Sequence, residues 1–445
     1  MTDAHSTRGA LLALSLAMLL SSLGTSVANV ALPSLATAFH ATFPEVQWIV
    51  LAYLLATTVS LVVVGRLGDV AGRKRLLVGG ILVFTAASIL CASAGSLALL
   101  ITARAAQGVG AAAMLSLAIA LVAGTVPKER SGRAMGLLAT MSAIGTAVGP
   151  SAGGLLIASF GWRAIFAVNV PLGLVAAALA HRYLPGESTS NGGASSGWGA
   201  ALRERGLAGA LVTSGLVSTV MMATLVVGPF YLSRALGLDA ARVGLVMSAG
   251  PIVAALTGVP AGRLGDRFGA TRITLAGLVV LTIGSAMLCA LPPTGTVAYL
   301  VPLVVMTAGY GLFQTSNNTA VMTGVTNAHR GIVSGMLTLS RNLGLIAGAS
   351  VMGTVFAVAT GGDMASARPD AVAMGMRTTF ALASVLLAIA LGIAAFGARK
   401  SQGGAYLKMS ENASWSKRSS GLTSCTGPRG ADGASVTVRT RRHPA

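Results

Sequence analysis

The stretch GRLGDVAGRKR, residues 65–75, is the densest cluster of charge in the first half of the chain, and GRLGDRFGATR repeats it at residues 262–272. Both stretches lie between long apolar runs. An apolar run of about 20 residues is long enough to cross a bilayer as a helix. Because each charged stretch follows the second apolar run of its half, the sequence predicts two related halves that thread through a membrane.

The composition indicates the same class of fold. Of the 445 residues, 54% are hydrophobic and only 10% are charged, whereas a soluble domain is about 25% charged. In lipid every backbone polar group must be satisfied internally, which leaves helices or a closed barrel. The apolar runs are too long, and alternate too little, for barrel strands. We therefore predict an all-α integral membrane protein.

The apolar runs predict twelve transmembrane helices in two six-helix bundles. The expected spans are 8–30, 48–64, 76–94, 97–122, 134–159, 162–180, 207–231, 243–261, 273–291, 297–323, 332–359 and 378–396. The predicted domains are an N-terminal bundle (1–181), a Gly/Ser-rich linker (182–206), a C-terminal bundle (207–397) and a basic tail (398–445). The tail is rich in Ser, Gly and Arg, so we expect it to be disordered.

The formal net charge of +19 follows from how the loops are charged. Of the Lys and Arg residues in predicted loops, 14 fall on the side of the N-terminus and five on the other side. The positive-inside rule then places both termini in the cytoplasm. No compact basic domain remains for nucleic acid. Three cysteines, in no metal-binding or disulfide pattern, predict no metal site and no cofactor.

Three motifs carry a resemblance to a known family. The charged stretch at 65–75, RAAQGVGAA at 104–112 and GTAVGPSAGG at 145–154 resemble, in this order, motifs of the major facilitator superfamily. TSVANVALPSLA at 25–36, GWRAIFAVNVPLG at 161–173 and RNLG at 341–344 resemble its drug:proton antiporter branch, which usually has fourteen helices. The resemblance implies a multi-pass cell-membrane transporter of small molecules, coupled to protons, and we expect a monomer.

In that family the charged loop latches the two halves together. The resemblance implies this role here for Gly65, Asp69, Gly72 and Arg73, and a weaker latch at the second copy, Gly262, Asp266 and Gly269. The second copy is weaker because it lacks basic residues at the positions of Arg73 and Lys74. Alternatively, the loop's basic residues are solvated anchors that only orient the chain.

Two arginines fall inside predicted spans, where a guanidinium costs at least about 2.5–3.5 kcal/mol. Arg104, with Gln107 one turn away, and Arg341, with Asn342 beside it, are therefore candidates for coupling or substrate contact. The alternative for Arg104 is a structural bond to backbone carbonyls of a neighbouring helix. Amides at membrane depth are further candidates, either for substrate contact or for helix-to-helix bonds: Asn29, Asn169, Asn317 and Asn318.

The fifth predicted helix carries a run of small residues and a proline. Its members are Gly145, Gly149, Pro150, Gly153 and Gly154. Small residues four apart allow close helix packing, and a proline can kink a helix. The resemblance implies that this helix belongs to an antiporter and seals it against leak. The alternative is ordinary packing that has no bearing on direction.

None of the twelve Asp and Glu residues falls well inside a predicted span. Aligned on NVALP, residues 29–33, Gly24 stands where the related branch has an Asp. Two buried arginines without a buried acid would create a positive potential, so we expect a neutral or anionic substrate. Asp69 is then the best-placed acid for charge sensitivity.

Three functions remain open on the sequence. The first is a secondary exporter, the second an importer of nutrients or metabolites on the same fold, and the third a membrane sensor or scaffold. An enzyme is not expected, because the sequence contains no ATP-binding GxxxxGK[ST] loop and no HExxH motif. Without an ATP site, transport must draw on an ion or substrate gradient.

Overall fold

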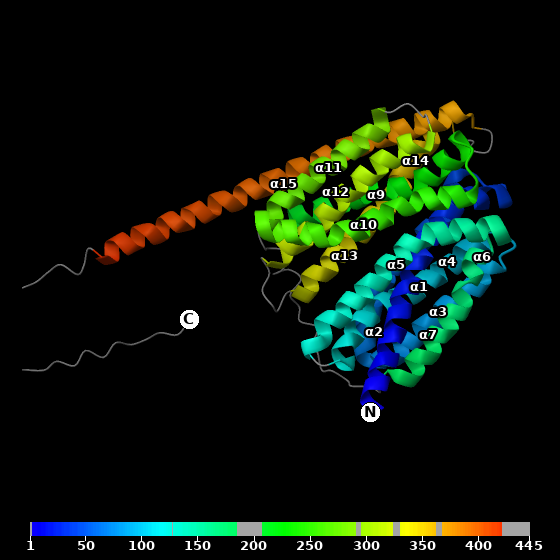
Figure 1. Ribbon diagram of the computed structural model, residues 1–445, viewed down its shortest axis with the longest axis horizontal. Helices are drawn as coiled ribbons and strands as arrows, with labels where there is room; N and C mark the ends of the chain where they lie inside the picture. Colours follow the sequence, from blue (N-terminus) through cyan, green and yellow to red (C-terminus); the bar gives the residue numbers. More distant parts are fainter. Residues whose placement is uncertain are drawn as a thin grey trace, which may run out of the picture. The chain divides into compact units, whose positions relative to one another are not determined.

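The computed structural model describes residues 2–126, 128–184, 207–290, 295–323, 330–361 and 367–420. These ranges are helical apart from short connections (Figure 1). In the first half the helices are α1 (Thr2–Ala38), α2 (Phe43–Ala71), α3 (Arg73–Ala92), α4 (Leu97–Thr125), α5 (Lys128–Phe160), α6 (Ala164–Ala167) and α7 (Asn169–Tyr183).

The second half begins with α9 (Leu207–Phe230), which continues into a π-helical turn, η1 (Tyr231–Ala235). It goes on with α10 (Ala240–Phe268), α11 (Ala270–Ala290), α12 (Gly295–Thr323), α13 (Arg330–Ala347), a second π-helical turn η2 (Gly348–Met352), α14 (Gly353–Ala359) and α15 (Pro369–Ser420). The expected linker (182–206) begins inside the last turn of α7, and its residues 185–206 lie outside the described residues, as do residues 421–445.

Twelve spans in the described residues are long and apolar enough to cross a membrane, which confirms the predicted number. The helices are longer than the apolar runs that predicted them. For example, α2 ends at Ala71 rather than near Val64, and so includes the start of the charged loop. This difference arises because hydropathy identifies only the residues that lie in lipid. A helix can continue beyond the lipid as long as its backbone hydrogen bonds are made.

The chain divides into two compact units, residues 1–396 and 397–445. The sequence predicts disorder from residue 398, but α15 runs on to Ser420. A helix that is already formed in the membrane adds residues without a new nucleation step. A polar continuation can therefore remain helical even though it has no apolar side to bury.

The two halves of the first unit repeat the same packing. In the first half α1 packs on α5, while α2 and α3 both pack on α4. In the second half α9 packs on α13, while α10 and α11 both pack on α12. The repeated pairing shows that the duplicated loop belongs to a duplicated bundle of six spans.

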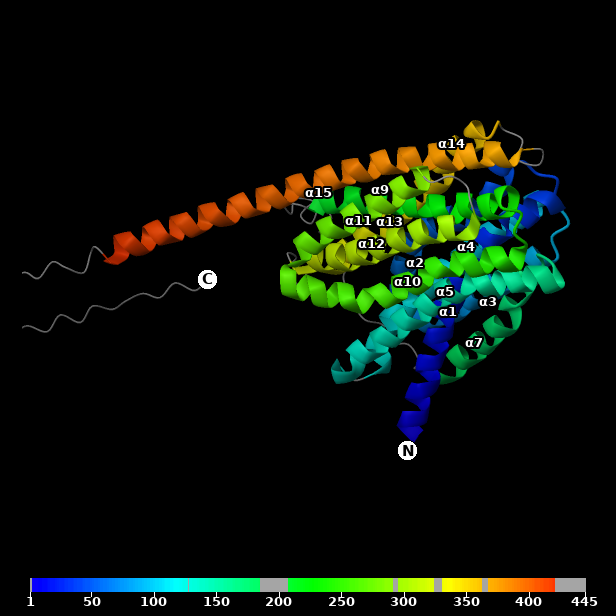
Figure 2. The same cartoon turned by 45° about the horizontal axis from the view of Figure 1, so that its top comes forward.

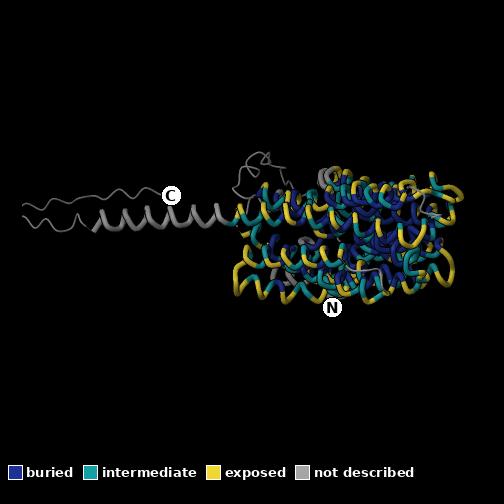
Figure 3. Tube along the Cα trace, turned by 90° about the horizontal axis from the view of Figure 1, so that it is seen from above, coloured by how far each residue is buried: buried dark blue, intermediate teal, exposed yellow. Residues whose placement is uncertain are grey.

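The burial pattern is that of a protein in lipid. Buried residues gather between the helices and exposed residues lie on the outside (Figure 3). Many exposed side chains are large and apolar, among them Leu256, Val297 and Val358. Since lipid tails are as apolar as leucine, these residues are placed as a bilayer requires.

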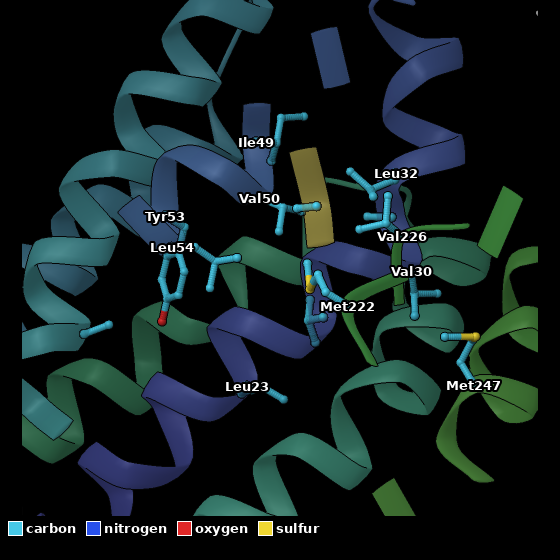
Figure 4. Packing of buried hydrophobic residues seen from close by; sticks show 14 of the residues in the cluster. Leu23, Val30, Leu32, Ile49, Val50, Tyr53, Leu54, Met222, Val226 and Met247 are labelled. Carbon is cyan, nitrogen blue, oxygen red and sulfur yellow. The ribbon is translucent and has the colours of Figure 1, made fainter. Parts of the chain in front are cut away.

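The halves meet along α5 and α10, which lie side by side (Figure 1 and Figure 2). They also meet where α2 contacts α13 and α14, and where α1 contacts α9. Figure 4 shows Met222 and Val226 of α9 near Leu32 of α1. Phe43 begins α2 and stacks edge-on against Phe230 (4.8 Å between ring centroids) and Phe356 (5.4 Å). We call the end of the bundle that holds these three rings the aromatic end, and the opposite end of α2 the loop end.

Candidate functional site

The centre of the first bundle is organised around one arginine. Arg104 of α4 is fully buried. Its Nε donates to the carbonyl of Ile49 in α2 (3.1 Å), and its Nη1 donates to the carbonyl of Gly24 in α1 (3.1 Å). Nη1 also donates to Oε1 of Gln107, one turn along α4 (2.6 Å). A single side chain therefore joins three helices.

Aromatic rings complete the surroundings of this guanidinium. Its Cζ lies 4.2 Å from the ring centroid of Tyr53 and 6.0 Å from that of Phe166. A cation over an aromatic face is attracted by the ring quadrupole, and more strongly when both are desolvated. Gln107 extends the hydrogen-bond network to α3, since its Nε2 donates to Oγ of Ser88 (2.8 Å).

Tyr53, Phe166 and Ser88 were not predicted as site residues. Tyr53 lies four residues after Ile49 and therefore on the same side of α2, and its hydroxyl donates to the carbonyl of Ser21 (3.0 Å). The only signal in the sequence was a polar or aromatic residue inside an apolar run. Partners on other helices, half of them backbone carbonyls, leave no pattern at all.

No carboxylate balances Arg104 among the residues that the structure describes. Carbonyl dipoles, an amide oxygen and two rings surround the cation instead, and Nη2 has no hydrogen-bond partner. Gly24 stands where the related branch has an Asp. A Cβ at Gly24 would lie 3.0 Å from Cζ of Phe84, so this ring fills the space that a side chain at position 24 would enter.

The expected lack of deep acids holds for the described spans. Glu45, Asp266 and Asp370 are the acids inside the described membrane spans, and each lies within a few residues of the end of its span. Glu45 closes the first turn of α2, because its Oε2 accepts from N (2.7 Å) and Oγ1 (2.8 Å) of Thr42. The Thr-x-x-Glu spacing is a capping box that the sequence analysis did not use.

Arg341 differs from Arg104, and the prediction of two buried arginines is wrong on this point. Arg341 lies in α13 and its side chain is exposed, whereas neighbouring Asn342 is only 7% exposed. The structure gives Arg341 no hydrogen bond or ion pair with any described residue. The two arginines lie at similar positions along their spans, which begin at Leu97 and Val333, but one faces the interior of the bundle and the other is exposed.

The four amides lie at buried or half-buried positions with bonding capacity to spare. Asn29 and Asn169 each donate from Nδ2 to the carbonyl one turn earlier, and the Oδ1 of each is unpartnered. Asn317 of α12 has an unpartnered Nδ2, and Asn318 beside it is half-buried. Asn29 bonds within α1, and Asn169 bonds to α6, the short helix just before its own, so neither amide links two separate spans here.

The glycines of α5 face two different helices. A Cβ at Gly145 would lie 2.7 Å from the carbonyl oxygen of Leu19, and a Cβ at Gly149 would lie 1.9 Å from Oγ of Ser26, both in α1. Gly153 is less constrained, since its Cβ would meet Val27 at 3.5 Å.

Gly154 points to α10 of the other half instead. Its Cβ would lie 2.3 Å from the carbonyl oxygen of Ala240. In the reverse direction, a Cβ at Gly244 would lie 2.3 Å from the carbonyl oxygen of Pro150. The small-residue run therefore lets α5 pack closely against α1 of its own half and against α10 of the other half.

The two copies of the charged loop share one backbone turn. Gly72 follows α2 with φ 89° and Gly269 follows α10 with φ 91°, in the left-handed region that favours glycine. Gly262 has open space around it. The surroundings of Gly65 and the side chain of Asp69 lie outside what the structure describes, so the predicted part of both residues in a latch stays a prediction.

The remaining loop residues differ in their contacts. Arg73 is half-buried and takes part in an interaction, whereas Asp266 of the second copy is exposed. Lys74 was not predicted as a site residue, yet its Nζ donates to the carbonyl of Leu184 just past α7 (2.7 Å). This bond ties the first loop to the end of the first bundle, and the second copy has Thr271 in that position.

Known proteins share this sequence and fold. The Major Facilitator Superfamily profile matches residues 14–349. The uncharacterized transporter YebQ of Escherichia coli is 29% identical over 401 residues, covering 77% of this chain and 88% of that protein. The riboflavin transporter RibZ of Clostridioides difficile is 28% identical over 401 residues, with 78% and 88% covered. The multidrug resistance protein Stp of Mycobacterium tuberculosis is 29% identical over 404 residues, with 78% and 75% covered.

A solved structure supports the fold. The bacterial homologue of the human lysosomal transporter Spinster, in an inward-facing and unoccupied conformation, superposes with a TM-score of 0.75 at 20% identity. The match covers 88% of this chain and 97% of that one. With its twelve spans, the chain is thus a multi-pass protein of the inner membrane, and it belongs to the Major Facilitator Superfamily.

Proposed function

We propose that this chain exports small drug-like or metabolite molecules by alternating access, driven by the proton gradient. The observation that carries the proposal is the glycine crossing of Gly154 and Gly244. It brings the backbones of α5 and α10 together between the two halves. Alternating access requires one half to rock against the other around a fixed site. A contact made by glycines alone can separate without breaking charged bonds.

The proposal places the loop end and both termini in the cytoplasm. Arg73, Lys74 and Arg75 lie at the loop end, where α2 gives way to α3, and the positive-inside rule favours that side for basic loops. The aromatic end then faces outwards, closed by Phe43, Phe230 and Phe356. Substrate would reach such a protein from the cytoplasmic side.

The relatives support a transporter but divide on what is carried. Stp is named for multidrug resistance and JefA of Mycobacterium tuberculosis, 28% identical over 410 residues, is named a drug efflux pump. These names and the glycine run of α5 favour export. RibZ is named a riboflavin transporter, which keeps a metabolite as cargo, and import on the same fold, as the second candidate.

The residues have distinct roles in this proposal. Arg104 and Gln107 hold α1, α2, α3 and α4 in one arrangement, so they position the first bundle. The unpartnered amide atoms of Asn29, Asn169 and Asn317 offer hydrogen bonds to a polar substrate. Proton sensitivity is assigned to Asp69 because the described spans hold no deep acid. The protein acts as a monomer in the bilayer, without catalysis, cofactor or nucleic acid.

Uptake into inverted membrane vesicles tests the proposal. Riboflavin, tetracycline and the dicationic biocide chlorhexidine are offered with and without an imposed inward-acid pH gradient. We expect uptake of a neutral or anionic compound that rises with the gradient and is absent from vesicles that lack the protein. Uptake only in right-side-out vesicles would establish import. Absence of transport in both orientations would favour a sensor or scaffold, and selective uptake of the dication would contradict the expected charge preference.

A further inference from the structure

Arg341 is a charged residue inside a membrane span that has no partner among the residues the structure describes. It lies eight residues into the span Val333–Ala359, which is about 12 Å along the helix axis. That is deeper than the helix ends where arginine side chains reach back to the interface. Its side chain is exposed and bonds to no described residue. Facing lipid, it would cost at least about 2.5–3.5 kcal/mol.

Two exposed polar residues precede Arg341 on the same side of the helix, and Leu345, one turn after it, is half-buried. Ser334 and Thr338 precede it by seven and three residues, and both are exposed. Successive residues turn by about 100° around a helix, so the three side chains fall within about 60° of one another. We call Ser334, Thr338 and Arg341 the polar stripe of α13.

A second side of α13, away from the polar stripe, carries apolar residues. Leu343 is 53% exposed, and Leu339 and Ile346 are half-buried beside it. These three residues centre about 140° away from the polar stripe. Because a polar or charged side chain costs more than an apolar one against lipid, this distribution favours the acyl chains on the side of Leu343 and the polar stripe on the opposite side.

Packing against α9 occupies the side of α13 next to the stripe. Oγ of Ser340 donates to the carbonyl of Leu211 (2.6 Å), and a Cβ at Gly344 would lie 2.2 Å from the carbonyl oxygen of Gly215. The stripe is adjacent to this contact but not covered by it. Since α13 also contacts α2 of the other half, it lies at the boundary between the two halves.

Further unpartnered polar atoms lie on α12, which contacts α13. Oε1 of Gln314 and Nδ2 of Asn317 have no hydrogen-bond partner. A buried polar atom without a partner is costly. These atoms supply an acceptor and a donor for a bound molecule in the same bundle as the stripe.

We propose that Arg341 binds the carboxylate or sulfonate of a small organic anion carried by this protein, with Ser334 and Thr338 as hydrogen-bond donors beside it. The inference rests on the proposed transport function and adds the substrate class. A guanidinium presents a planar fork of donors that matches a carboxylate in two parallel bonds. Arg104 is unsuited to this task because Ile49, Gly24 and Gln107 already hold its Nε and Nη1.

The first experiment asks which medium Arg341 faces. Single-cysteine variants Arg341→Cys and Leu343→Cys are made in a chain whose three native cysteines are replaced by alanine, and a membrane-impermeant methanethiosulfonate is added to inverted vesicles. We expect rapid labelling at position 341 and none at 343 until detergent is added. Labelling at 343 but not at 341 would place the arginine on the lipid side and overturn the proposal.

The second experiment measures charge selectivity with two dyes that share a ring system. Fluorescein is an anion and rhodamine 6G a cation, and their binding to the purified full chain in nanodiscs is followed by fluorescence anisotropy. We expect Arg341→Gln to weaken fluorescein binding about tenfold or more, the loss of about 1.4 kcal/mol, with rhodamine 6G binding unchanged. Arg341→Lys should fall in between.

Arg368→Gln is the matched control, since it removes the same charge from an exposed position near the start of α15 and should leave fluorescein binding unchanged. Absent fluorescein binding in the wild type, or equal binding in Arg341→Gln, overturns the inference. Because binding does not depend on transport direction, failure of export in vesicles leaves this result interpretable. If Arg341→Gln exports the compound as well as the wild type does, the anion site is contradicted but the proposed export function is not.

Discussion

Gly154 of α5 and Gly244 of α10 face each other across the boundary between the halves, and a Cβ on either would lie 3.0 Å from the Cα of the other. No side chain separates the two backbones at this point. Small residues allow such an approach in membrane helices. The crossing therefore fixes how closely the two halves can come together.

We expect Gly154→Ala and Gly244→Ala to hold the aromatic end open. Overpacking costs about 1–3 kcal/mol, which would disfavour the closed arrangement by about 5–150-fold. A cysteine at Gln47, buried between the halves against Gly353, should then react with an impermeant thiol reagent added outside intact cells. Gly153→Ala is the control, because its Cβ meets Val27 at an ordinary 3.5 Å. Equal labelling in all variants would contradict the role of the crossing.

Arg104→Lys should destabilise the first bundle. A lysine ammonium cannot reproduce the guanidinium fork, and a hydrogen bond to a charged group contributes about 1.5–3 kcal/mol. We expect a lower midpoint of thermal aggregation for the purified protein, measured by size-exclusion chromatography after heating. Arg341→Lys should leave the midpoint unchanged, since Arg341 has no partner among the described residues. A midpoint that moves only in the Arg341 variant would reverse these two assignments.

Replacing glycine by alanine should have opposite effects on stability in the two turns and inside a helix. Gly72→Ala and Gly269→Ala place a side chain at φ 89° and 91°, which costs about 1–2 kcal/mol for an L-residue. Gly79→Ala lies within α3 with nothing within 4 Å of its Cβ, so it should stabilise by about 0.5–1 kcal/mol. Thermal midpoints of the three variants check the sign. A loss of stability at position 79 would show that the substitution acts through something other than the turn.

Asp69→Asn should lower transport while leaving membrane insertion intact. The reason is that Asp69 is the best-placed acid of the first loop, and the described spans hold none deep in the membrane. Vesicle uptake under a pH gradient is the measurement, normalised to the amount of protein inserted. Asp266→Asn provides the comparison and should have a smaller effect, because Asp266 is exposed. Wild-type transport by Asp69→Asn would refute a latch at this residue.

The fold was predictable because lipid imposes it. Length of apolar runs, loop charge and a duplicated motif were enough for twelve spans in two related bundles. The helix ends were less predictable, since α2 and α15 continue past their apolar runs into charged sequence. Hydropathy has no information about where a helical backbone stops once lipid is left behind.

The sequence identified single residues of the candidate site, but it did not predict which of them are buried or what they contact. Arg104 and Arg341 gave the same signal, a charge within an apolar run, yet one is fully buried and the other exposed. Angular position around α13 would have separated them, because Ser334 and Thr338 share a side with Arg341, whereas Leu339 and Leu343 lie on the other side. The acceptors of Arg104 lie 55 and 80 residues away in the chain, and a backbone carbonyl has no signature in sequence.

The duplicated loop has a consequence for the symmetry of the molecule. Gly72 and Gly269 keep almost the same φ, 89° and 91°, whereas the basic pair Arg73 and Lys74 has Ala270 and Thr271 as its counterparts. Duplication therefore preserved the path of the backbone more fully than the charge, because the second copy keeps counterparts of Arg66, Asp69 and Arg75 but not of the basic pair. The two halves are equivalent as mechanical bodies but inequivalent as electrical ones. A voltage or a pH difference would act on them unequally even if their movements were related by a two-fold rotation.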